Sequence, residues 1–297
     1  MPAGDRPTLS LDHDARGYRY YRNAVERHWD PAEIDLAADR ERILETGIEI
    51  ADLKRTLALF GAGEQAVTED LAPLATVLSD VHDQLFVTTQ LYEEAKHADF
   101  FDRYWREVIH AVEDERGEDR SFPTEDRWFP DDYVELFRRN DEAMHRLLES
   151  DTPENRAAAY CHYHLVIEGI LAQTGYFGVQ TSYSGEDEEL PRLPGLVEGF
   201  TKIRGDEGRH VGFGMAKLKE LVEAGEVAPE FLRDTVGELV PLTQGIVVES
   251  TDEDAPGVSQ DSLVEYAAER HTQRMQQIVD ASAEIPDVEE LVKLEGD

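Results

Sequence analysis

The sequence of 297 residues predicts an all-α fold, a bundle of long helices. Apolar residues recur at alternating steps of four and three, which is the spacing of the buried face of a helix. The strict alternation of apolar and polar residues that is typical of strands is not evident, nor is an internal repeat. We expect a single domain over residues 1–297, with a loose N-terminal arm at 1–16 and an acidic tail at 286–297.

Prolines divide the first half of the chain into helices. Asp30-Pro31 marks a turn, and Pro73 kinks or ends a helix because proline removes a backbone hydrogen bond. Residues 112–130 are rich in Glu, Asp, Arg and Pro, which predicts a surface loop. The expected helices are, in order, residues 18–29, a stretch from residue 32, residues 48–78 and residues 81–111.

Further helices are expected in the second half. Pro153 opens one of them, since proline fits the first turn of a helix, and residues 185–194 form a loop before the next. These helices are expected at residues 131–149, 153–183, 195–225, 229–248 and 260–281.

The charge balance excludes nucleic acid as a partner. The chain has 29 basic and 65 acidic residues and a formal net charge of −36, which would repel phosphate. Such an acidic, hydrated surface is typical of proteins from a salt-loving source, where salt screens the repulsion. The single cysteine, Cys161, allows no internal disulfide. Neither an apolar run of about eighteen residues nor a signal peptide is evident, so we expect a cytoplasmic protein without a transmembrane segment.

The motif Glu-x-x-His recurs in the chain, and on a helix its two side chains share a face. Carboxylate and imidazole then form half of a metal site. An isolated copy is more often a solvated surface pair, so the copies have to be sorted by the face that they occupy. The copies are Glu94/His97, Glu107/His110, Glu142/His145 and Glu207/His210.

Two copies are expected in solvent. Glu94 is in register with an apolar stripe, whereas Glu107 is rotated about 220° from it. Glu142 is likewise rotated away from the stripe of its helix. The two stripes are Val87, Leu91, Ala98, Phe101, Trp105 and Val108, and Val134, Phe137, Met144 and Leu148. The pairs Glu94/His97 and Glu207/His210 remain as candidates.

The segment around Glu207 is rich in glycine, although each glycine costs a helix about 0.5–1 kcal/mol relative to alanine. We therefore expect another part of the chain to approach this backbone closely. The glycines are Gly205, Gly208, Gly212 and Gly214.

Two further carboxylates occupy apolar segments. Glu168 interrupts Leu165-Val166-Ile167-Glu168-Gly169-Ile170-Leu171, where an unpaired buried charge would be costly, and Glu64 follows the small, apolar residues 57–63. The order Glu64, Glu94-x-x-His97, Glu168, Glu207-x-x-His210, each part on its own helix, matches the ligand set of ferritin-like di-iron and di-manganese bundles. We therefore expect a ferritin-like four-helix core with additional helices.

Short motifs of the sequence also suggest a family. They are Gly63-Glu64-Gln65-Ala66-Val67-Thr68, Glu94-Ala95-Lys96-His97, Tyr163 five residues before Glu168, and Asp206-Glu207-Gly208-Arg209-His210. With them the chain resembles the ribonucleotide reductase small-subunit superfamily over residues 15–285. Within that superfamily it resembles the ligand-binding oxidases that carry a mixed manganese and iron cofactor.

The resemblance implies a ligand set. Glu64, Glu94 and His97 would hold manganese, and Glu168, Glu207 and His210 would hold iron, with Glu94 bridging; iron in both positions is the alternative. Asp206 would accept a hydrogen bond from His97 and so orient its ring. Tyr176 would line the same cavity.

The resemblance also implies an activity. In the resembled oxidases the metal pair activates dioxygen, a long-chain fatty acid binds at the metals, and an ether link forms between a valine and a tyrosine, here Val67 and Tyr163. We expect a two-electron oxidation of a hydrophobic substrate and a homodimer.

Two other functions remain open. A reductase small (beta) subunit would hold a radical or an oxidant for a large subunit. Such subunits usually have a tyrosine where this chain has Phe101 and another near the C-terminus, whereas the last tyrosine here is Tyr266. A metal-binding bundle without turnover is the second alternative. His162 and His164 point about 200° apart on a helix, so we do not expect a third metal site there.

Overall fold

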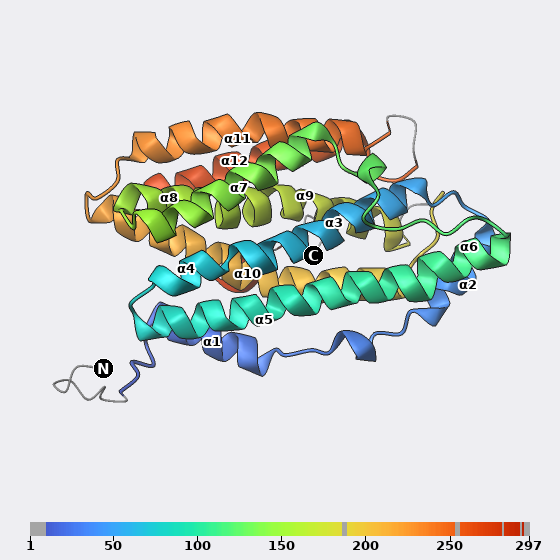
Figure 1. Ribbon diagram of the computed structural model, residues 1–297, viewed down its shortest axis with the longest axis horizontal. Coiled ribbons are helices and arrows are strands. Elements are labelled where there is room, and N and C mark those ends of the chain that lie inside the picture. The colour runs from blue at the N-terminus through green and yellow to red at the C-terminus, as the bar shows by residue number, and fades with distance from the viewer. Residues whose placement is uncertain (1–9, 186–188, 253–255, 281, 292, 294–297) are drawn as a thin grey trace.

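The computed structural model describes residues 10–185, 189–252, 256–280, 282–291 and 293. The all-α prediction is confirmed, since these residues form helices and no strand (Figure 1). Part of the expected arm and part of the expected tail lie outside the described residues. No helix within the described residues combines the length and apolar character that a membrane crossing requires.

The helices follow the chain from one end to the other. The first half contains α1 (Arg16–Glu26), η1 (Pro31–Glu33), α2 (Ala37–Thr46), α3 (Ala51–Asp70), α4 (Ala72–Val77), α5 (Val81–Tyr104), η2 (Trp105–Ile109) and α6 (His110–Arg116). The second half contains η3 (Asp126–Trp128), α7 (Asp131–Glu149), α8 (Pro153–Tyr160), η4 (Cys161–Ala172), α9 (Gln173–Tyr183), α10 (Pro194–Glu223), α11 (Pro229–Ser250), α12 (Gln260–Val279) and α13 (Val288–Leu291). The segments η2 and η4 are π-helical, with backbone hydrogen bonds from residue i to i+5.

Four helical runs form the core of the bundle: α3, α5, the continuous run α8–η4–α9, and α10. α5 packs against α3 and α1, and α10 packs against η4 and α9. Figure 1 shows α1 and α5 together along one edge of the molecule and α11 and α12 along the opposite edge. The other core helices therefore lie between α5 with α1 on one side and α11 with α12 on the other.

Most predicted helix bounds agree closely with the structure. The expected break near Pro73 falls at Leu71, and Pro73 lies in the first turn of α4, where its missing N–H is not needed. The predicted loop at 112–130 is partly wrong, because α6 continues to Arg116 and η3 forms within it. The π-helical segments inside two of the long helices were not predicted from the sequence.

The buried face of α7 differs from the prediction. Val134 and Leu148, which we expected in the core, are 55% and 54% exposed. Tyr133, Leu136 and Leu147 are buried instead. Two neighbouring apolar columns run along this helix, so periodicity alone did not choose between them.

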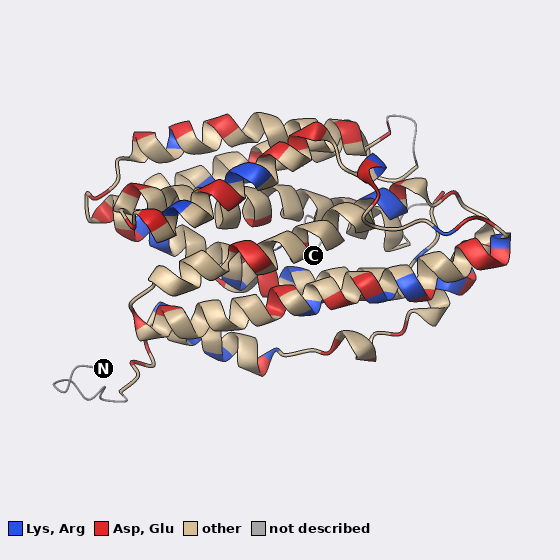
Figure 2. Cartoon of the chain, viewed as in Figure 1, with Lys and Arg blue, Asp and Glu red and all other residues tan. Residues whose placement is uncertain are grey.

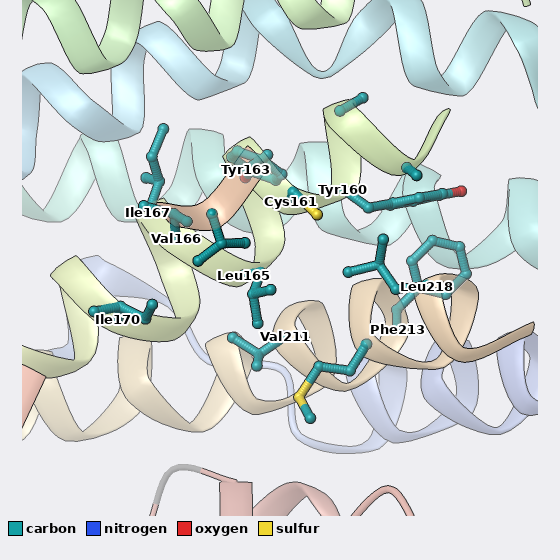
Figure 3. Close-up of a cluster of buried hydrophobic side chains, with 14 of the residues drawn as sticks. Tyr160, Cys161, Tyr163, Leu165, Val166, Ile167, Ile170, Val211, Phe213 and Leu218 are labelled. Carbon is teal, nitrogen blue, oxygen red and sulfur yellow. The ribbon is translucent and has the colours of Figure 1, made fainter. Parts of the chain in front are cut away.

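η4 and α10 face each other across an apolar layer of the core. Leu165 of η4 and Val211 of α10 point toward each other (Figure 3), and both are fully buried. A Cβ atom at Gly214 would lie 2.2 Å from Cβ of His164, which no side chain could tolerate without a shift of the helices. Glycine therefore sets the distance between these two elements.

The other glycines of α10 differ from one another. A Cβ at Gly212 would lie 2.6 Å from Oη of Tyr20, so α1 also approaches this backbone closely. A Cβ at Gly205 would meet no atom within 4 Å. The expected close approach is thus found at Gly212 and Gly214, and the expectation is wrong at Gly205.

Candidate metal centre

Six residues that the sequence analysis selected meet at the centre of the four-helix core. α3 supplies one, α5 two, η4 one and α10 two, and none is more than 7% exposed. These residues are Glu64, Glu94, His97, Glu168, Glu207 and His210, and we call them the six-residue cluster. They form two overlapping groups, in each of which the candidate ligand atoms lie within 4.8 Å of one another.

The first group is arranged around His97. Its Nδ1 atom lies 3.3 Å from Oε2 of Glu64, 3.4 Å from Oε2 of Glu94 and 3.5 Å from Oε1 of Glu207. Three carboxylates and one imidazole nitrogen therefore face a common centre.

The second group is arranged around His210. Its Nδ1 atom lies 3.1 Å from Oε1 of Glu94, 3.4 Å from Oε1 of Glu168 and 3.5 Å from Oε2 of Glu207. Glu94 and Glu207 thus belong to both groups. The resemblance implied that only Glu94 would bridge, so the shared position of Glu207 is a finding from the structure.

The cluster has the properties of a cation site. Within the described residues, Oε2 of Glu168, Oε2 of Glu207 and Nδ1 of His210 have no hydrogen-bond partner. Burial, together with the charge of Glu207, raises the pKa of Glu168 to about 8, and burial also raises the pKa of Glu64. Four carboxylates packed this closely in a buried site cannot all ionise without a compensating positive charge. Nitrogen and oxygen donors in this ratio fit divalent metals of the first transition series.

Each histidine contacts a second carboxylate through its other ring nitrogen. Nε2 of His97 lies 3.1 Å from Oδ2 of Asp206, the partner expected from the resemblance, and Nε2 of His210 lies 2.9 Å from Oε2 of Glu93. Arg209 donates to both of these carboxylates. Such contacts fix each ring so that Nδ1 points toward the cluster.

Two neighbours of the site, Glu93 and Trp29, were not predicted from the sequence. Glu93 lies seven residues after Phe86 and seven before Phe100, and all three are buried, so this spacing is a signal that could have revealed it. Nε1 of Trp29 donates to Oδ2 of Asp206 over 2.8 Å. That contact joins residues far apart in the chain, and no local pattern indicates it.

The π-helical segment η4 brings Tyr163 and Glu168 to the same side. Residues five apart stack along a π-helix, whereas on an α-helix they would point in different directions. Oη of Tyr163 donates to Oε1 of Glu94 over 2.8 Å, and Nε2 of Gln90 donates to Oε1 of Glu168 over 3.1 Å. The tyrosine hydroxyl therefore lies in contact with the cluster.

A cavity of about 210 Å³ adjoins the cluster. Four carboxylates of the cluster contribute to its lining, which is otherwise mostly apolar. Val67 and Tyr176, which the resemblance placed near the site, are both part of this lining. Apolar residues of its wall include Phe60, Ile167, Leu171, Val179, Val258 and Leu263.

The remaining candidates lie elsewhere. Glu107 and Glu142 are on the surface, where they pair with Arg103 and Arg138. Nε2 of His164 lies 3.3 Å from Oε1 of Gln90, and burial lowers the pKa of His164 to about 3. Burial likewise lowers the pKa of His162 to about 4. Neither histidine belongs to a candidate metal group in the described part of the chain.

A bundle in which four helices contribute four carboxylates and two histidines is a ferritin-like dinuclear carboxylate protein. Comparison with known families gives the assignment within this class. The chain belongs to the family of ribonucleotide reductase small chains, whose model matches residues 13–278. It is thereby an oxidoreductase.

Solved structures of R2-like ligand-binding oxidases are similar to this chain. A valine-to-leucine mutant with an aerobically reconstituted Mn/Fe cofactor is 29% identical, with a TM-score of 0.78. A tyrosine-to-phenylalanine mutant is 29% identical with a TM-score of 0.77, and a glutamate-to-aspartate mutant is 28% identical with a TM-score of 0.78. Each alignment covers 90% of this chain and 95% of the matched oxidase chain.

Proposed function

We propose that this chain is an oxidase that activates dioxygen at a manganese and iron pair beside an apolar ligand cavity. The observation that carries the proposal is the pair of four-residue groups that share Glu94 and Glu207 and adjoin that cavity. The similar solved structures are named as ligand-binding oxidases with a reconstituted Mn/Fe cofactor, which supports the same reading.

Two metal positions follow from the two groups. Glu64 and His97 would hold manganese, Glu168 and His210 would hold iron, and Glu94 and Glu207 lie within reach of both; iron in both positions is the alternative. The bound pair would supply the electrons that reduce dioxygen to an oxidant. Asp206 and Glu93 orient the two imidazoles from behind, and the surrounding core excludes water.

The names of the similar structures give further support. In them the mutated valine follows the mutated glutamate by three residues, and two mutated tyrosines lie thirteen residues apart. The same separations relate Glu64 to Val67 and Tyr163 to Tyr176 in this chain. All four of these residues line the cavity.

We further propose an ether link between Oη of Tyr163 and a side-chain carbon of Val67. Its formation breaks one O–H and one C–H bond and releases two protons and two electrons, which dioxygen accepts at the metal pair. Tyr163 donates its hydroxyl hydrogen to Glu94, so a carboxylate stands ready to receive the tyrosine proton. Val67 lies in the lining of the same cavity, which brings both partners to one space.

The proposed ligand is a long-chain fatty acid or a similar molecule. Its carboxylate would bind at the metals and its chain would occupy the apolar cavity. The lining supports this assignment, because four of its six carboxylates belong to the cluster and Phe60, Ile167 and Leu171 supply apolar wall. The same cavity would hold the hydrophobic substrate.

We also propose a homodimer formed through α4 and the first half of α5. Figure 2 shows these two segments almost without charged residues, whereas the second half of α5 carries many. Their exposed side chains are Ala72, Thr76, Val81, Gln84, Thr88 and Tyr92. In a chain with a net charge of −36, an uncharged face is the one on which two copies repel each other least.

Peptide mass spectrometry tests the proposed activity. Protein loaded with manganese and iron is digested with and without exposure to air. We expect a Val67 peptide joined to a Tyr163 peptide, with two hydrogens lost, only after exposure. Tyr163→Phe, which should keep both metals, serves as the control without a crosslink.

The same experiment separates the alternatives. A full complement of metals without the crosslink would favour a storage bundle or a reductase subunit. Specific binding to a reductase large subunit would then identify the latter.

A further inference from the structure

Lys96 distinguishes the two halves of the six-residue cluster. Its side chain is 3% exposed, and Nζ lies 2.7 Å from Oδ2 of Asp206 as an ion pair rather than an aligned hydrogen bond. The ring of Trp29 also contacts this ammonium group, with Nζ 4.6 Å from the ring centroid. A positive charge is therefore held in the core, one residue before His97.

This charge competes with His97 for one carboxylate oxygen. Oδ2 of Asp206 lies 3.1 Å from Nε2 of His97, and it also accepts from Nε1 of Trp29 over 2.8 Å. Lys96 is the third group on the same atom, and Arg209 occupies Oδ1. Because its negative charge is divided among these groups, Asp206 is a weak acceptor for the ring N–H of His97.

Glu93, the carboxylate partner of His210, has fewer other contacts than Asp206 has. Oε2 of Glu93 lies 2.9 Å from Nε2 of His210, and within the described residues no other group contacts that oxygen. Arg209 contacts Oε1. His210 thus has a carboxylate oxygen to itself, whereas His97 shares one with two other donors.

From this asymmetry we propose that Lys96 sets the metal preference of the His97 half by weakening the hydrogen bond between His97 and Asp206. The inference rests on the proposed function. A carboxylate that accepts strongly from the outer N–H makes a histidine a more basic ligand. More basic donors favour iron, which binds nitrogen and oxygen ligands more tightly than manganese does. Lys96 reduces this advantage of iron at His97, so the His97 half of the cluster accepts manganese.

The variant Lys96→Gln tests the proposal, since it removes the charge and keeps a side chain of similar length. Metal-free protein is crystallised without oxygen in equal concentrations of Mn²⁺ and Fe²⁺. Anomalous diffraction at the two absorption edges then gives the occupancy of each metal in each half. We expect the iron-to-manganese ratio in the His97 half to rise on the order of tenfold, the lower range for a changed outer partner. The His210 half should keep its ratio.

Two control variants make the result specific. Lys54→Gln removes another lysine that pairs with a buried carboxylate, that of Glu113, also over 2.7 Å but away from the cluster. Lys96→Arg retains the charge. Both should keep the wild-type distribution.

The outcomes are distinguishable. An unchanged ratio in Lys96→Gln, an equal shift in both halves, or loss of metal from both would overturn the role of Lys96. Absence of metal from both halves of the wild-type chain would instead overturn the proposed function itself.

Discussion

The carboxylate of Asp39 accepts the backbone N–H of Leu196 over 2.7 Å and caps the helix that carries Glu207 and His210. Its other oxygen accepts the N–H of Gly195 over 2.9 Å. These are two of the backbone groups that a helix leaves unpaired at its N-terminus. A residue of α2 therefore fixes the start of α10.

Replacement of Asp39 should destabilise the fold. We expect Asp39→Ala to lower the free energy of unfolding by about 2–3 kcal/mol, because two buried N–H groups lose a charged acceptor. Asp39→Asn should lose less, since its amide oxygen still accepts one bond. Urea unfolding measures both, with Asp99→Ala on the exposed face of α5 as the control. Equal stability of Asp39→Ala and this control would contradict the capping role.

The glycines of α10 should respond in opposite directions. Gly214→Ala should lower stability by about 1–3 kcal/mol, because the new Cβ would overlap His164. Gly205→Ala should raise it by about 0.5–1 kcal/mol, because the site is open and alanine favours the helix. Thermal unfolding of the two variants gives the comparison. Unchanged or higher stability of Gly214→Ala would show that the distance between η4 and α10 is not set by Gly214.

Glutamates of the cluster should differ in how many metals they retain. Glu207→Ala should weaken both metal positions, since Glu207 belongs to both groups, whereas Glu64→Ala should weaken only the His97 half. Elemental analysis after anaerobic loading and dialysis measures the metal content per chain. Glu142→Ala, from a surface copy of the same motif, is the matched control and should retain both metals. Retention of both metals by Glu207→Ala would exclude its shared role.

Metal binding should depend on pH through Glu168. Burial and the charge of Glu207 raise its pKa to about 8, so the metal-free fold holds a proton that a metal must displace. Affinity for Mn²⁺ should therefore increase from about pH 6 to about pH 8 and then level off, with proton release on binding. The stability of the metal-free fold should change in the opposite sense, decreasing as pH rises toward 8, because only the folded state retains this proton.

Anaerobic titration with Mn²⁺ at several pH values, followed with a proton indicator, tests this expectation. In Glu168→Gln the rise should be smaller, since the group that titrates is gone. The same affinity at pH 6 and pH 8 in the wild-type chain would mean that Glu168 holds no proton.

The sequence predicted the helices and the cluster well because both depend on local periodicity. Glu94 could be distinguished from Glu107 because the two residues point in different directions on one helix. Glu168 could be recognised as a candidate because it interrupts an apolar segment. The contacts that the outer ring nitrogens of His97 and His210 make with carboxylates could not be predicted from periodicity. Trp29 and Asp206 meet only through packing of α1 and its following turn against α10, and Lys96 becomes a buried charge only because that contact forms.

The π-helical segment η4 lets Tyr163 and Glu168 face the cluster together although they are five residues apart. Loss of a single codon between them would leave them four apart, which is the spacing at which residues of an α-helix share a face. The apolar composition of the helix would be unchanged, so the bundle would still assemble. A related gene with one codon fewer in this segment would thus encode the same architecture with both side chains still at its centre. Within such bundles, the number of residues between this tyrosine and this glutamate has to be interpreted together with the type of helix that carries them.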